Sequence, residues 1–171
     1  MVSMKILLEE LALKSSHSFS EHVAFGNVLL PSNGWSQEHT ERSLEVTLPE
    51  DIITGWSLFS DLYLCTNAQS NDGYGMHIAS PDWVVAANRV YKTMDGFGLQ
   101  RGDVIIGEFL DNGEFLGLRC DVNASDFGSV MVKPEIAERY EWPVVADSLS
   151  EFITAYLSHD GRRFWDNLAT T

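Results

Sequence analysis

The chain has 171 residues, of which 44% are hydrophobic and 11% aromatic, so it is large and apolar enough to bury a core and is not a disordered acidic tail. Its 25 acidic and 11 basic residues give a formal net charge of −14 at pH 7. This surplus argues against direct binding to nucleic acid and to anionic membranes, which needs Lys and Arg, while it suits a basic partner or simply solubility.

The first thirty residues carry few strong signals. The segment SSHSFSEH is typical of a loop, and before it an apolar set could form a short amphipathic helix: Ile6, Leu7, Leu8, Leu11 and Leu13. The start lacks a signal-peptide core and no apolar run approaches membrane-spanning length, so we expect a cytoplasmic protein. Without a repeat or a convincing linker, we expect one domain over residues 1–171, with residues 1–30 an extension of uncertain structure.

Two helices are expected next. Residues 31–34 form a turn, and Ser36 can cap a polar surface helix that runs through Glu45. In LPEDIITGWSLFSDLYL, Pro49 suits a first helical position, with two acids beside it at the positive end of the helix dipole. One buried helical face is indicated by the spacing of Ile52, Ile53, Trp56 and Phe59.

The middle of the chain changes to the strand period. TNAQSNDGYG is a loop, GMHIAS a short strand, and Ser80-Pro81-Asp82 begins the helix SPDWVVAANRVY. After a further loop, DVIIGEFL and EFLGLRCD flank Asn112-Gly113, which predicts a β-hairpin. SVMVK is a third strand, closed by Pro134.

A capping box predicts the last helix. Ser148 can accept from the Glu151 amide and Glu151 can reach back to Ser148, while Gly161 stands where the helix should stop. The apolar face of this helix would contain Phe152, Ile153, Tyr156 and Leu157. The layout predicts an α+β fold, with a mainly antiparallel central sheet and helices packed against it.

Motifs for catalysis or metal binding are absent from the sequence. It has no Gly-x-Ser-x-Gly, no His-Glu-x-x-His and no phosphate loop. DVNASDFGSVMV begins like a calcium loop at Asp121 but has Asp126 where glycine is needed and Val132 where a bidentate Glu is needed. We therefore expect no metal and no cofactor, although folding could still assemble a cluster in space.

The histidines and cysteines favour structural roles. No pair among His17, His22, His39, His77 and His159 has ligand spacing supported by a carboxylate or thiol. His77 could be a hydrogen-bonded residue of a strand, and His159 lies at a helix end. Cys65 and Cys120 are expected to be buried free thiols, with one long-range disulfide as the alternative.

The acidic residues are unevenly distributed. No Lys or Arg lies between Arg42 and Arg89 or between Arg101 and Arg119, although both stretches contain several acids. Those around the hairpin turn, Glu108, Asp111 and Glu114, are expected to be a solvated face instead of an acid–base pair. The two stretches could merge into one negative surface, or their acids could scatter over the molecule.

Three segments resemble the SMI1/KNR4, or SUKH, superfamily. SLEVTLPEDI resembles its Leu-Glu and Leu-Pro entry into a helix, and GDVIIGEFLDNGEFLGLRCD its glycine-punctuated central hairpin. SVMVK followed by VVADSLSEFITAYL resembles its last strand and closing helix. The resemblance covers residues 31–157 and implies an α+β core there. For bacterial members it implies an immunity protein that neutralises a toxin, often a nuclease; eukaryotic members are regulatory scaffolds.

We therefore expect a non-enzymatic immunity protein that binds a basic toxin domain. The alternatives are a regulatory or scaffold protein without a toxin, and a small hydrolase whose site assembles only in space. The candidate partner-binding residues are Asp72, Glu108, Asp111, Glu114, Asp121 and Asp126.

Overall fold

The computed structural model describes residues 3–16, 26–32, 34–66, 75–110 and 112–166. The expectations for His17, His22, Asp72, Asp111 and most of the loops SSHSFSEH and TNAQSNDGYG concern residues outside these ranges. Within them the chain has the expected α+β fold, 38% helical and 25% strand. The elements are α1 (Met4–Ser16), β1 (Gly26–Pro31), α2 (Gln37–Leu44), α3 (Glu50–Leu58), β2 (Phe59–Thr66), β3 (Met76–Ile78), α4 (Pro81–Tyr91), β4 (Asp103–Phe109), β5 (Phe115–Arg119), β6 (Val130–Lys133), a 3₁₀ turn η1 (Arg139–Glu141), β7 (Val144–Ala146) and α5 (Leu149–Ser158).

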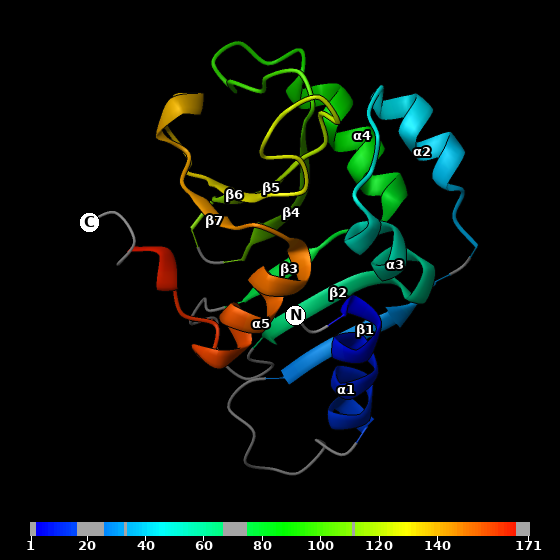
Figure 1. The fold of residues 1–171 in the computed structure, drawn as a ribbon. Helices are drawn as coiled ribbons and strands as arrows, with labels where there is room; N and C mark the ends of the chain where they lie inside the picture. Colours follow the sequence, from blue (N-terminus) through cyan, green and yellow to red (C-terminus); the bar gives the residue numbers. More distant parts are fainter. Residues whose placement is uncertain (1–2, 17–25, 33, 67–74, 111, 167–171) are drawn as a thin grey trace.

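The sheet is an antiparallel meander. Its seven strands lie in the order β1 to β7, so every strand pairs with its neighbours in sequence, and α4 is inserted between β3 and β4. Figure 1 shows α2 and α4 together at the upper right and α1 at the bottom. Among the described residues, no helix combines the length and the apolar character needed to cross a bilayer.

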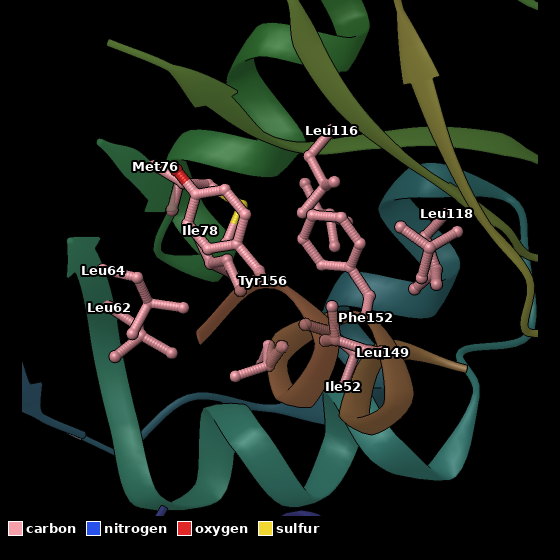
Figure 2. Packing of buried hydrophobic residues seen from close by; sticks show 14 of the residues in the cluster. Ile52, Leu62, Leu64, Met76, Ile78, Leu116, Leu118, Leu149, Phe152 and Tyr156 are labelled. Carbon is pink, nitrogen blue, oxygen red and sulfur yellow. The ribbon is translucent and has the colours of Figure 1, made fainter. Parts of the chain in front are cut away.

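One face of the sheet carries the main core. Leu62 and Leu64 of β2 face the same side as Leu116 of β5, where α3 and α5 cover them with Ile52 and Phe152 (Figure 2). All five side chains are fully buried. The core face therefore uses every second residue of the strands, as expected for a sheet face that helices cover.

The helix α1 belongs to this core. Its inner side buries Leu7, Leu8 and Leu11, whereas Ile6 and Leu13 are exposed. The expected helix therefore forms, and its inner side uses three of the five apolar positions.

The stretch LPEDIITGWSLFSDLYL is a helix followed directly by a strand, which the helical prediction missed. Pro49 is the residue before α3, and the helix stops at Leu58. Phe59 is fully buried at helical spacing from Trp56, but it is also the first residue of β2. Two periods overlap at this residue, so the helix pattern concealed the start of the strand. The strands β1 and β7 were also missed.

Most end signals of the helices are confirmed. Ser36 accepts from the His39 amide at 3.3 Å and Ser148 from the Glu151 amide at 3.2 Å. The second half of the capping box is displaced by one residue, because Glu151 accepts from the Asp147 amide at 3.0 Å and not from Ser148. The predicted side-chain cap at Ser80 does not form. Instead, the Ser80 amide donates to Asp61 Oδ1, from a strand distant in sequence, at 3.1 Å.

The predicted hairpin is confirmed as β4 and β5. Glu108 lies opposite Phe115, and the Phe109 amide closes the loop by donating to the Glu114 carbonyl at 2.9 Å. Gly113 has a φ of +70°, which favours glycine in the turn. The expected strand SVMVK is β6, paired with β5.

Candidate functional site

The hairpin acids do not form one solvated face. Glu108 is partly exposed, with 40% of its side chain accessible. Glu114, expected to be solvated, is buried: its carboxylate pairs with Arg163 and accepts from the side-chain Nδ2 of Asn112 at 2.9 Å. The reason is the C-terminal segment, which returns to the hairpin after α5 and brings Arg163 to it. Asp111 lies outside the described residues.

A second group of acids is neutralised by arginines that come from other elements. Asp103 has only 1% of its side chain exposed. Its Oδ1 accepts from Arg119 Nη1 at 2.9 Å, and its Oδ2 accepts from Arg139 Nε at 2.6 Å. Arg119 also lies 3.8 Å from Asp121 and 3.4 Å from Asp126. In this region the acids are dispersed among arginines. The stretch between Arg101 and Arg119 has no Lys or Arg in sequence, but in the fold its Asp103 is neutralised by Arg119 and Arg139.

The two stretches without Lys or Arg do not merge at the groove of about 530 Å³ that other acids line, because Glu45 is the one acid of either stretch among its lining residues. One wall is formed by α2 and the residues after it, with Glu38, Glu41 and Glu45. The other wall is formed by residues 101–102 and 120–123, with Asp121. Four carboxylates and two arginines, Arg42 and Arg101, line the groove, so its charge is net negative.

The groove acids differ in how far they are engaged. Glu41 Oε1 accepts from the Leu48 amide at 2.8 Å, which fixes the connection between α2 and α3. Glu38 lies 4.0 Å from Arg42 on the solvent side of α2. Glu45 is exposed and ends α2 in the left-handed conformation, with a φ of 62°. Among the described residues Glu45 has no salt bridge within 4.0 Å, unlike Glu38, and the expected Asp121 lines the other wall of the groove.

A separate cluster surrounds His77 on the face of the sheet opposite the main core. Cross-strand pairing places Tyr63, His77 and Glu108 in one row over β2, β3 and β4. His77 Nε2 is 2.8 Å from Asp61 Oδ1, and Nδ1 is 3.8 Å from Glu108 Oε1. The Tyr63 ring stacks on the imidazole at 4.3 Å. Burial, helped by the carboxylates of Asp61 and Glu108, raises the pKa of Tyr63.

This cluster fits the structural role expected for His77. His77 is 8% exposed, and Asp61 Oδ1 contacts both the imidazole and the Ser80 amide at the start of α4. The imidazole interactions found in the described chain are to carboxylates and rings, and none is to a hydroxyl or thiol. The geometry orders the β2–β3 pair and the start of α4, and it lacks the nucleophile–base contact of acyl-transfer enzymes.

No group of three or more His, Cys, Asp or Glu side chains is placed to hold a metal ion in the ranges that the structure describes. In the stretch that begins like a calcium loop, Asp121 Oδ1 accepts from the Asn123 amide at 3.0 Å. The Asp121 carboxylate therefore supports a turn of its own backbone.

Both cysteines are buried free thiols, as expected. Burial raises the pKa of Cys65 to about 11. Burial also raises the pKa of Cys120. Thiolates are the reactive form of cysteine, so neither residue is suited to nucleophilic chemistry near neutral pH.

Sequence reasoning missed Asp61, Glu41 and Glu45 as site residues. Glu45 was within the stretch without Lys or Arg, but its position on the groove depends on the packing of α2 against residues distant in sequence. The alternation of Asp61 and Tyr63 at strand period was the signal that could have indicated the row of Tyr63, His77 and Glu108. The prediction of a helix over the preceding residues concealed it. No protein-family model matches the chain, and no curated protein sequence matches it either.

Proposed function

We propose that the chain is a non-enzymatic immunity protein of the SUKH type that acts in the cytoplasm by binding and occluding a basic toxin domain. The observation that carries this proposal is the acidic groove between α2 and residues 120–123. Together with a net charge of −14, it offers a concave negative surface to a cationic protein.

The order of the elements supports the same proposal. The segment SLEVTLPEDI contains the end of α2 and the start of α3, and the central hairpin motif spans β4 and β5. SVMVK contains β6, and VVADSLSEFITAYL contains all of β7 and all of α5 except its last residue. The segments that resemble the SUKH superfamily therefore lie in one sheet and its helices, in chain order, with β2, β3 and α4 between the first segment and the second.

The structure changes the set of residues that we assign to partner contact. Asp121 stays because it lines the groove, and Glu45 joins it. Glu108 and Asp126 stay as partly exposed acids outside the groove wall. Glu114 is removed because it is buried against Arg163. Long-range attraction by such acids accelerates association more than it tightens the final complex.

Co-expression with the product of the reading frame directly upstream tests the proposal. We expect that product to be toxic alone and harmless together with this chain. For the purified pair, we expect the association rate to fall roughly tenfold or more between about 0.05 and 0.5 M NaCl, because salt screens the groove acids. We also expect Glu45→Gln to slow association more than Glu10→Gln, an equal charge change on the exposed side of α1.

Two results would count against the proposal. A neighbouring product that is harmless by itself would favour the regulatory or scaffold function. A complex whose formation does not depend on salt would remove the electrostatic argument, even if the toxin were neutralised.

A further inference from the structure

The segment KPEIAERYEW, residues 133–142, turns its basic side chains inward. Lys133 is 2% exposed, and its Nζ donates to the Pro134 carbonyl at 2.9 Å and lies 4.4 Å from the centre of the Phe97 ring. Burial lowers the pKa of Lys133, although Glu135 opposes this shift. Arg139 is held by the buried Asp103 carboxylate through two nitrogens, at 2.6 and 3.2 Å. Both cations are therefore occupied: Arg139 by the Asp103 carboxylate, and Lys133 by a carbonyl of the segment itself and by the Phe97 ring.

Further contacts fix the backbone of residues 134–141, which we term the anchor loop. Trp142 is 4% exposed, and its Nε1 donates to the Ala137 carbonyl at 3.3 Å. The Glu138 amide donates to Glu141 Oε2 at 2.8 Å, which forms a reciprocal cap around η1. The anchor loop is thus held by Lys133 before it, by its own Arg139, by Trp142 and by its own cap.

The outer side of this ordered loop is apolar and acidic. Ile136 is 93% exposed and Tyr140 is 83% exposed, the two highest values among the large hydrophobic residues described. Glu135, Glu138 and Glu141 are exposed around them. In the described part of the chain, none of these three carboxylates forms a salt bridge within 4.0 Å.

An isoleucine and a tyrosine on a fixed loop are suited to binding. The loop is already ordered, so burying the two side chains in a partner costs little further backbone entropy. Tyrosine is enriched among the residues that dominate binding energy, and those residues are usually surrounded by polar contacts. Acids around the two side chains select a partner whose own border is basic, and they disfavour a second copy of this chain, whose loop would carry the same charges.

We infer that the anchor loop is the docking element for the basic protein partner, with Ile136 and Tyr140 entering an apolar pocket bordered by Lys and Arg. This inference rests on the proposed immunity-type function and adds the surface that supplies affinity. Asp103 joins the two regions, since it binds Arg139 of the loop and Arg119, which lies 3.8 Å from Asp121 at the groove. The groove steers the partner, and the anchor loop holds it.

The test measures binding of the upstream reading frame's purified product to Ile136→Ser and Tyr140→Ser variants. Each is expected to weaken the complex by about 30-fold or more, mainly by faster dissociation, because each removes a side chain that the partner buries in the complex. Ile6→Ser is the matched control: Ile6 is 52% exposed on α1, and its replacement should leave affinity within about threefold of wild type. Urea denaturation of the free variants should match wild type, since both anchors are on the surface.

The outcomes separate this inference from the proposed function. Wild-type affinity in both anchor variants, with a salt-dependent complex, overturns the anchor loop and leaves the immunity function standing. If wild type forms no complex either, both proposals fall. If sedimentation shows a dimer of this chain that Tyr140→Ser dissociates, the loop is a self-association surface and the inference is wrong.

Discussion

At the scale of single residues, the determining feature is a buried carboxylate shared by two arginines. Asp103 follows Gly102 at the start of β4 and has partners 16 and 36 positions away in sequence, Arg119 and Arg139. A charge at this depth is tolerated only because both oxygens are occupied by charged donors. The same interaction orders the loop that carries Tyr140.

We therefore expect Asp103→Asn to lower the free energy of unfolding by about 3 kcal/mol, because it leaves two partly buried guanidinium groups without their shared counter-charge. Urea denaturation followed by tryptophan fluorescence measures the change. Asp95→Asn is the control: Asp95 is exposed, and its replacement should change stability by less than about 0.5 kcal/mol. If the two variants were equally stable, the ion pairs of Asp103 with Arg119 and Arg139 would make no net contribution to the free energy of unfolding.

At the scale of elements, features set by nearby residues were predictable and features set by distant residues were not. The caps of α2 and α5 each use a serine and an amide three positions on, so they are legible in the sequence. The strand β1 is defined by its pairing with β2, in which Leu30 lies opposite Asp61. The strand β7 is defined by its pairing with β6, in which Val144 lies opposite Met131. Those pairings depend on the assembled sheet, and three-residue strands such as β7 are too short to show a period.

Two glycines of the central hairpin differ in how tightly distant residues pack around them. A Cβ at Gly107 would lie 2.1 Å from the His77 carbonyl oxygen of β3, so a side chain there must displace the neighbouring strand. A Cβ at Gly117 would meet its nearest atoms, in Met131, at 3.6 Å, which is ordinary contact. Neither glycine has a positive φ, so the difference lies in packing and not in backbone strain.

From this difference we expect Gly107→Ala to lower the free energy of unfolding by about 3 kcal/mol, through overpacking between β3 and β4. Gly117→Ala should change it by less than about 1 kcal/mol, because the added methyl group fits. Thermal and urea denaturation of the two variants compare the positions directly. A Gly107→Ala variant as stable as Gly117→Ala would mean that β3 moves away without cost.

At the scale of the whole molecule, the candidate site shows what a charge pattern omits. The sequence gives the number of acids and the gaps between basic residues, but not which acids meet an arginine after folding. Glu114 and Arg163 are 49 positions apart, and their contact removed one of the expected partner residues. Glu45 and Asp121 come to one groove by the packing of α2 against the loop after β5. Surface acids could thus be predicted as a class, but not their roles.

The N-terminal helix allows a last test at this scale. The sequence predicts an extension over residues 1–30, but Leu8 of α1 is 2% exposed and lies in the same core cluster as Trp56 and Phe152. If α1 is part of one cooperative unit, Leu8→Ala should lower the global free energy of unfolding by about 3 kcal/mol, because it leaves a cavity. Ile6→Ala, on the exposed side of the same helix, should cost less than about 0.5 kcal/mol. Far-ultraviolet circular dichroism and tryptophan fluorescence should then report one coincident transition for Leu8→Ala. An early, separate loss of helical signal, with the tryptophan transition unchanged, would instead show that α1 unfolds independently of the sheet.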